Sequence, residues 1–264
     1  MNKPIYVSIT SIYSRQHFLY ECLLSIIKQT ITPTKICIYL SEDKSLHDEG
    51  FKNKIIDNNK LNKILNNKIF EIIWGKDIGP YGKFLPLLKN KIDEDCLIIT
   101  IDDDTIYNKH LIENLVNDYM KHNCVISYRG FVPLLNNNDL ISFDYNKKID
   151  IKNVNNININ NFATGKGGIL YHPSFFKKVE GLIFRNDIYS ETCKFADDIW
   201  LNIVRIINNV PCYVEFNLPK CFVHDYYPQK CLHLINNNAT NEKNLNTIQF
   251  RDTIKKLRSL GFVI

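Results

Sequence analysis

The sequence predicts an α/β fold in which a mostly parallel sheet is flanked by helices. Short runs rich in β-branched residues alternate with amphipathic helical patterns through the first half of the 264-residue chain. Each of the first four runs is followed by polar residues, as at the carboxyl end of a parallel strand. Beyond Pro133 the sequence becomes Asn-rich and aperiodic. Alternating strands and helices are typical of a parallel sheet covered on both faces.

The first element, PIYVSIT at 4–10, has the composition of a strand, and Phe18, Cys22 and Ile26 in 17–30 share one face of a helix. Further strands are expected at 35–40, 69–74, 96–101, 124–128 and within 167–176, and further helices at 51–67, 111–120, 197–209 and around 250–257. No repeat or flexible linker interrupts these elements. We therefore expect one domain over residues 1–264, with a regular half 1–130 and an irregular half 131–264.

Composition limits the partners and the compartment. The net charge is +5, and no Lys/Arg run of the kind that binds nucleic acid is present, so an anionic small molecule or a membrane surface suits the charge better. The eight cysteines form no CxxC pair, which argues against zinc ribbons and favours reduced thiols. The N-terminus does not resemble a signal peptide, and no apolar stretch approaches the ~20 residues of a membrane span. We expect a cytoplasmic protein with at most peripheral membrane contact.

Polar side chains follow the four predicted parallel strands, where open α/β sheets bind their ligands. They are Thr10, Tyr13 and Arg15 after the first strand, Glu42 after the second, Lys83 after the third, and Asp102, Asp103 and Asp104 after the fourth. Carboxylates spaced D-x-D can present oxygens to Mg²⁺ or Mn²⁺, and Lys83 and Arg15 could balance phosphate charge. These residues predict a metal–nucleotide diphosphate site. The alternative is a solvated turn whose last aspartate caps the next helix.

The stretches YVSITSIYSR, IYLSED, ITIDDDTIY and ADDIWLNIV resemble GT-A-fold (Rossmann-like) nucleotide-sugar glycosyltransferases, chiefly the family-two-like group. TGKGGILYHPSFF and DDIWLN are also similar to stretches of exostosin-like transferases. The resemblance covers residues 5 to about 210. It implies a Mn²⁺- or Mg²⁺-dependent hexosyl- or N-acetylhexosaminyl-transferase that takes sugar from a nucleotide donor, most commonly UDP. The acceptor would be a hydroxyl of a glycan, lipid-linked or protein substrate, bound by residues 131–264, with the donor bound by residues 1–130.

The resemblance also implies roles for individual residues. Asp104 would be the metal-binding member of the DxD motif, with Asp102 and Asp103 facing ribose, donor sugar or metal. The stretch Thr10 to Arg15, including Tyr13, and Glu42 would lie near the base and ribose, and Lys83 near the diphosphate. Gly167 and Gly168 would permit close backbone contact in the floor of the sugar pocket. Glycines at such a junction can equally form a plain bend.

A second acidic pair, Asp197 and Asp198, opens a predicted helix. Glycosyl transfer needs a group that takes the proton of the attacking hydroxyl, and the resemblance makes Asp198 the candidate base. Alternatively, one aspartate caps the helix, or Asp198 orients substrate, as in exostosin-like enzymes that retain the anomeric configuration. His224, after an apolar run, is a candidate third metal ligand or an ordinary packed histidine.

Two other functions compete with this interpretation. IITIDDDTI is close to the strand and DxDx[TV] signature of haloacid-dehalogenase-type phosphatases, but Ile106 stands where Thr or Val is needed, and that motif normally follows the first strand. A non-catalytic nucleotide-sugar- or glycan-binding module would bind without turnover. A sugar nucleotidyltransferase would need a Gly-rich loop after the first strand, and TSIYSR has none.

Overall fold

A computed structural model of the chain describes residues 3–44, 48–137, 139–150, 156–215, 222–223 and 244–264. An eight-stranded sheet with the order β3-β2-β1-β4-β11-β6-β12-β9 forms its centre. The strands are β1 Ile5–Thr10, β2 Lys35–Ser41, β3 Phe70–Gly75, β4 Leu97–Thr100, β6 Val125–Ser127, β9 Asn156–Asn158, β11 Ile169–Tyr171 and β12 Cys212–Val214. β11 and β9 pair antiparallel with their neighbours, and the other pairings are parallel. The mostly parallel α/β sheet predicted from the sequence is confirmed.

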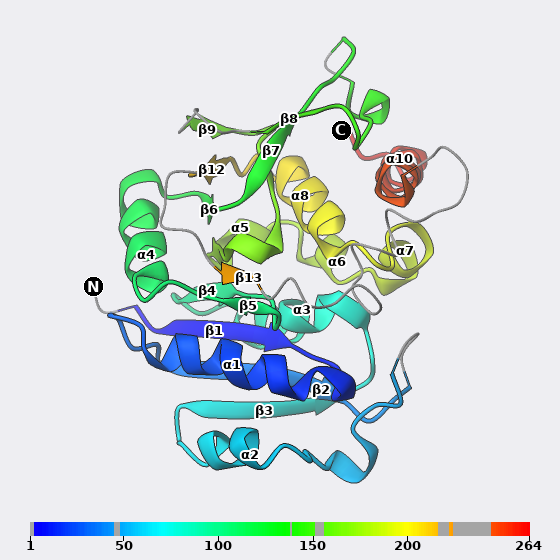
Figure 1. Cartoon of the computed structure of the whole chain (residues 1–264). Coiled ribbons are helices and arrows are strands. Elements are labelled where there is room, and N and C mark those ends of the chain that lie inside the picture. Colours follow the sequence, from blue (N-terminus) through cyan, green and yellow to red (C-terminus); the bar gives the residue numbers. More distant parts are fainter. Residues whose placement is uncertain (1–2, 45–47, 138, 151–155, 216–221, 224–243) are drawn as a thin grey trace.

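The first half has the regular alternation that its sequence predicts. Strand β4 is buried along its whole length, as expected for a strand covered on both faces. The main helices of this half are α1 Gln16–Ile27, α2 Asn59–Leu65, α3 Leu85–Lys91 and α4 Leu111–His122. In Figure 1, β3, β2, β1 and β4 lie one above another, and α1 lies beside β1 and β2. Their carboxyl ends therefore reach a common edge of the sheet.

Two helices differ from the prediction. The helix expected at 51–67 begins only at Asn59, because the side chain of Asn58 accepts a hydrogen bond from the N–H of Leu61 and caps it there. Just upstream, Asn53 and Lys54 adopt positive φ angles of 55° and 57°, which end a helical path. Helix α3 has no counterpart among the predicted elements, since it is only two turns long and carries Pro86 in its first turn.

The second half adds short strands and most of the remaining helices. A three-stranded sheet joins β10 Phe162–Ala163, β7 Gly130–Pro133 and β8 Lys148–Asp150, and β5 Thr105–Ile106 pairs with β13 Phe222–Val223. The helices are α5 Ser174–Lys177, α6 Glu180–Ile183, α7 Asn186–Thr192, α8 Asp197–Ile207 and α10 Leu245–Ser259. Stacked rings of Phe131 and Phe162 and the edge contact of Phe143 with Phe250 link this sheet to α10. Buried residues of both halves belong to one continuous hydrophobic core.

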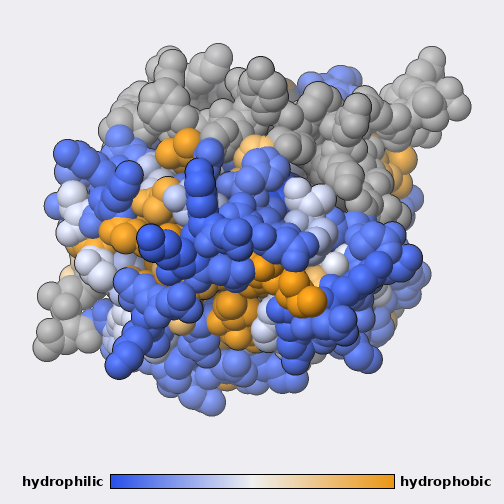
Figure 2. Space-filling view, turned by 60° about the horizontal axis from the view of Figure 1, so that its bottom comes forward, coloured by the Kyte–Doolittle hydropathy of each residue, from blue (hydrophilic) through white to orange (hydrophobic). Residues whose placement is uncertain are grey.

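Within the described ranges, none of the helices is both long and apolar enough to cross a bilayer. On the face in Figure 2, hydrophilic side chains predominate among the coloured residues, and the hydrophobic areas between them are small. The six cysteines in the described residues are free and buried, as predicted for small core side chains.

Candidate functional site

The aspartate triplet lies in a turn between β4 and β5 and is not a solvated surface turn. The Asp102 N–H donates to the hydroxyl of Tyr107 at 2.9 Å, which fixes the start of the turn. The side chains of Asp102 and Asp104 are 29% and 22% exposed, and that of Asp103 is 8% exposed. The following helix α4 begins at Leu111, so no member of the triplet caps it. The turn therefore presents two partly exposed acids and one buried acid.

Asp103, expected to face the ribose, the donor sugar or the metal, contacts protein side chains in the structure. One of its oxygens lies 2.7 Å from an Arg15 nitrogen, and the other accepts a 2.5 Å hydrogen bond from the Ser11 hydroxyl. Both oxygens are thus engaged by the loop after β1. Burial raises the pKa of Asp103 to about 6, with Arg15 opposing the shift and Asp104 adding to it. Asp103 holds two strand ends together, and its carboxylate is not open to a ligand.

This raised pKa predicts a pH dependence of stability. The folded protein binds the Asp103 proton more tightly than the unfolded chain does, so this contribution is full below about pH 4 and is lost as pH rises through about 6. We expect Asp103→Asn to flatten the decline of the unfolding free energy between pH 4 and 7, by at most about 3 kcal/mol. Urea unfolding at several pH values measures it. Asp93→Asn is the control, since Asp93 precedes β4 and pairs with Lys177 at the exposed surface. Parallel curves for wild type and Asp103→Asn would contradict the assignment.

The other residues after β1 also bond to the protein. The Arg15 guanidinium lies 2.7 Å from Asp104 as well as from Asp103, and its side chain is largely buried. The Thr10 hydroxyl donates to the carbonyl of Tyr39 in β2 at 2.9 Å. The Tyr13 hydroxyl donates to Asp57 at the surface. The loop after β1 therefore organises the acids, and each of these three side chains has a polar partner within the protein.

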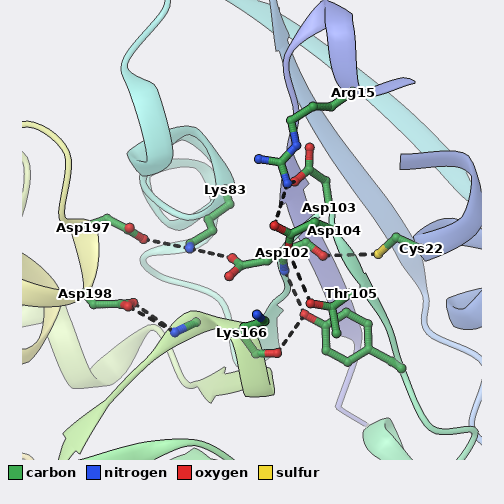
Figure 3. A network of polar contacts seen from close by, with 12 residues as sticks. Arg15, Cys22, Lys83, Asp102, Asp103, Asp104, Thr105, Lys166, Asp197 and Asp198 are labelled. Carbon is green, nitrogen blue, oxygen red and sulfur yellow. Dashed lines mark hydrogen bonds and ion pairs between the residues drawn. The ribbon is translucent and has the colours of Figure 1, made fainter. Parts of the chain in front are cut away.

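Lys83 is buried and joins the two acidic pairs (Figure 3). It ends the short 3-10 helix Gly79–Lys83, and its ammonium lies 2.8 Å from Asp102 Oδ1 and 3.1 Å from Asp197 Oδ2. Burial alone would raise the pKa of Asp102, but the positive charge of Lys83, with smaller effects of Arg15 and Arg129, holds it below its ordinary value. Lys83 is thus not the solvated surface residue that a lone lysine usually is.

Asp197 and Asp198 are the first two residues of α8, and neither is its N-cap, which is Ala196. The capping alternative is therefore wrong for both. The Asp198 carboxylate accepts from the Gly165 N–H, with both oxygens at 3.2 Å. Burial, and next the charge of Asp197, raise the pKa of Asp198 to about 7, against the opposing effect of Lys83. A carboxylate with this pKa is a stronger base near neutral pH than an ordinary one.

An asparagine one turn further along α8 fixes the partner of Asp198. The Asn202 amide accepts from the N–H of Ala163 at 3.0 Å and donates to its carbonyl at 2.8 Å, in the manner of a neighbouring strand. Buried Arg205 donates to the same Asn202 oxygen at 3.0 Å. This clamp holds β10, and with it Gly165, beside the start of α8. Sequence reasoning missed Asn202, although the DDIWLN stretch places it four residues after Asp198.

The glycines of the TGKGG stretch have different surroundings. A Cβ on Gly167 would lie 2.7 Å from the Arg129 backbone nitrogen, and one on Gly168, at φ 82°, would meet Leu111 at 3.2 Å. The close contacts of these two glycines are thus with the chain itself, in agreement with the plain-bend alternative. Gly165 is the glycine at the acids, where a Cβ would lie 2.8 Å from Lys83 Nζ.

Glu42 lies in a separate cleft at the carboxyl ends of β2 and β3. The cleft is lined by Glu42, Asp43, Lys54, Trp74, Gly75 and Lys76. The Trp74 ring is partly exposed, packs edge-on against Phe51, and has the Lys54 ammonium 6.0 Å from its centroid. Sequence reasoning missed Trp74 because it reads as an ordinary strand residue.

The two partly exposed acids fit a metal ion only together with other ligands. No group of three His, Cys, Asp or Glu side chains in the described ranges is arranged to hold a metal. Asp102 and Asp104 each contact a protein cation through one carboxylate oxygen, Lys83 and Arg15 respectively. Mg²⁺ and Mn²⁺ are commonly held by one or two carboxylates with phosphate and water oxygens, which these acids can provide. His224, the predicted third ligand, lies outside the described residues.

Comparison with known proteins supports the fold. No protein-family model and no curated protein matches the sequence. S. aureus TarS residues 1–349 in complex with UDP-GlcNAc is 15% identical with a TM-score of 0.51, over 83% of this chain and 58% of that chain. The TarS complex with UDP is 14% identical with a TM-score of 0.50, over 83% and 60%. Francisella tularensis 2-C-methyl-D-erythritol 4-phosphate cytidylyltransferase is 14% identical with a TM-score of 0.50, over 84% and 94%.

These similarities establish the architecture of the chain. It has the GT-A-like fold of nucleotide-sugar transferases, as the sequence resemblance predicts. The chain spans less than two thirds of the length of the TarS structures. Since a cytidylyltransferase shares the fold, the reaction has to be inferred from the site.

Proposed function

We propose that the chain is a glycosyltransferase that moves a sugar from a nucleoside diphosphate donor, most simply a UDP-sugar, to an acceptor hydroxyl. The supporting observation is the joining of two acidic pairs from distant parts of the sequence. Asp102 and Asp104 follow β4, Asp197 and Asp198 open α8, and Lys83 contacts one member of each pair. A donor diphosphate near the first pair would place its sugar toward the second pair, where the acceptor is deprotonated.

In this mechanism the acceptor oxygen attacks C1 of the donor sugar as the bond from C1 to the diphosphate oxygen breaks. Asp198 takes the acceptor proton, and the nucleoside diphosphate leaves with the bonding electrons. The Gly165 N–H orients the Asp198 carboxylate. Mn²⁺ or Mg²⁺, when bound by Asp102 and Asp104, supplies positive charge to the departing diphosphate. Lys83 and Arg15 add fixed positive charge to the same region.

The cleft that contains Glu42 and Trp74 is the proposed nucleobase site. An aromatic ring beside a polar rim offers a stacking surface together with hydrogen-bond acceptors for a base. The cleft lies at the ends of β2 and β3, on the same edge of the sheet as the aspartate triplet. The glycosyl donor would then extend along this edge from Trp74 toward Asp104.

Tryptophan fluorescence tests the nucleobase site directly. The chain has two tryptophans, and Trp200 is completely buried, so Trp74 is the ring that a ligand can reach. We expect UDP to quench the emission of wild-type protein and of Trp200→Phe but not of Trp74→Phe. Trp74→Ala should weaken UDP binding by about tenfold, the size of a stacking contact. Equal UDP affinity in Trp74→Ala and wild type would remove the cleft from the donor site.

A nucleotide-sugar screen tests the function as a whole. A ligand that binds the folded state raises its melting temperature, so UDP-sugars, other nucleotide sugars and CTP are compared with and without Mn²⁺. We expect a UDP-sugar to give the largest shift, with UDP-GlcNAc the first to test because a TarS structure contains it. Release of UDP then distinguishes a transferase from a non-catalytic binding module. A preference for CTP would favour nucleotidyl transfer, although TSIYSR after β1 lacks the Gly-rich loop which that reaction needs.

A further inference from the structure

Lys83 makes contacts that phosphate binding does not require. Its ammonium is shared between Asp102 Oδ1 at 2.8 Å and Asp197 Oδ2 at 3.1 Å, and its side chain is 8% exposed. Asp102 belongs to the turn after β4, and Asp197 begins α8. One buried cation thus connects the sheet edge to the helix that carries the candidate base (Figure 3).

Asp197 depends on this contact. It is 6% exposed, and its Oδ2 lies 3.1 Å from the Lys83 ammonium but has no further hydrogen-bond partner among the described residues. Asp102 and Asp198 add negative charge nearby. A buried carboxylate in such surroundings is held in place by its cation. Without the cation its charge is uncompensated, which favours rotation of the side chain or protonation.

Gly165 completes the connection. Its N–H bonds to Asp198, while the position of its absent Cβ lies 2.8 Å from Lys83 Nζ and 3.1 Å from Asp102 Oδ1. A side chain there would meet the flexible end of Lys83 first. Gly165, which orients Asp198, is therefore packed against the Lys83 bridge between Asp102 and Asp197. A displacement of Lys83 would then change the position of Gly165 and of Asp198 as well as that of the two bridged acids.

We propose that Lys83 is a positioning residue for sugar transfer: by joining Asp197 to Asp102 beside Gly165, it fixes Asp198 relative to the donor diphosphate. The inference rests on the proposed function and adds a role to Lys83 that differs from binding phosphate. A phosphate ligand acts on donor affinity, whereas a positioning residue acts on the rate of the bound complex.

The first test separates these two roles. Lys83→Met keeps the length of the side chain and removes its charge, and Lys89→Met, on the exposed side of α3, is the matched control. We expect Lys83→Met to lower kcat for UDP release from UDP-GlcNAc by about 100-fold, as misplacement of a reacting group does, with little change in the Kd of UDP–Mn²⁺. A large loss of UDP affinity at unchanged kcat would identify a phosphate ligand and overturn the proposal.

The second test is a double-mutant cycle with Asp197→Asn. If Lys83 acts through Asp197, the double variant should lose no more kcat than the worse single variant, and the unfolding free energies should also be non-additive. Additive losses in kcat in an enzyme that releases UDP would overturn the inference and leave the proposed function intact. A wild-type protein that binds UDP-GlcNAc but releases no UDP would instead refute the proposed function. In that case the double-mutant cycle in unfolding free energy would still measure the interaction between Lys83 and Asp197.

A third variant avoids removing a buried charge. Gly165→Ala places a methyl group against Lys83 Nζ, whereas Gly181→Ala in α6 meets nothing within 4 Å and serves as the control. We expect Gly165→Ala to reproduce the kcat defect of Lys83→Met, with a melting temperature near that of the control. A fully active Gly165→Ala would contradict the proposed coupling between Lys83 and Asp198 through Gly165, and this test does not depend on whether Lys83→Met folds.

Discussion

Asp198→Asn should lower the rate of sugar transfer by about 10²- to 10⁴-fold, the usual contribution of a general base, while UDP–Mn²⁺ binding stays close to that of wild type. The substitution is nearly isosteric, and the amide oxygen can still accept the Gly165 N–H, so the loop keeps its anchor. What disappears is the ability to take a proton. Single-turnover transfer rates, measured beside calorimetric UDP affinities, separate the two effects.

The pH profile gives an independent readout of Asp198. Because burial raises its pKa to about 7, the wild-type rate should rise with pH through about 7 and level off above it, as the carboxylate becomes ionised. The same shift means that the folded state loses stability as pH rises through that range, so Asp198→Asn should be the more stable protein above pH 7. Asp187→Asn, an exposed acid in the first turn of α7, is the control. Wild-type transfer rates in Asp198→Asn would end its catalytic role.

Most elements of the first half could be predicted from sequence periodicity, because the residue pattern of each segment agrees with the strand or helix that it forms. Buried β4 and amphipathic α4 lie where their patterns place them, since these segments have a single way to bury their apolar residues. The short strands of the second half, such as β10 and β12, are two or three residues long and have no period to detect. They are specified by contacts distant in sequence, such as the Asn202 clamp on Ala163.

The site shows the same division between local and distant information. Chain order alone brings polar residues to the ends of parallel strands, so Asp102 and Asp104 could be singled out from the sequence. Which acid is exposed and which is paired depends on partners far along the chain: Ser11 and Arg15 bury Asp103, and Lys83 meets Asp197. No local pattern encodes those distances. For the same reason Gly165 could not be told apart from Gly167 and Gly168 before the fold was known.

The aspartate triplet yields the second large effect that we expect. Asp104→Asn should weaken Mn²⁺-dependent UDP binding by at least about 100-fold, because an amide is a poor ligand for a hard divalent cation and the D-x-D pair then offers a single carboxylate. Arg15 keeps its 2.7 Å contact with Asp103 in this variant, so the turn should remain folded. Calorimetry of UDP with and without Mn²⁺ measures the loss, and the metal-free affinity should hardly change.

The neighbours of Asp104 in the sequence make this test specific. Asp103→Asn alters an acid whose two oxygens face Arg15 and Ser11, so it should leave the Mn²⁺ effect on UDP affinity in place. Asp93→Asn, at the opposite end of β4, should change neither quantity. If Asp104→Asn and Asp103→Asn lost metal-dependent binding equally, the triplet would act through its fold and not as a ligand. Undiminished UDP–Mn²⁺ affinity in Asp104→Asn would contradict the metal assignment, and the metal would have no place in the proposed reaction.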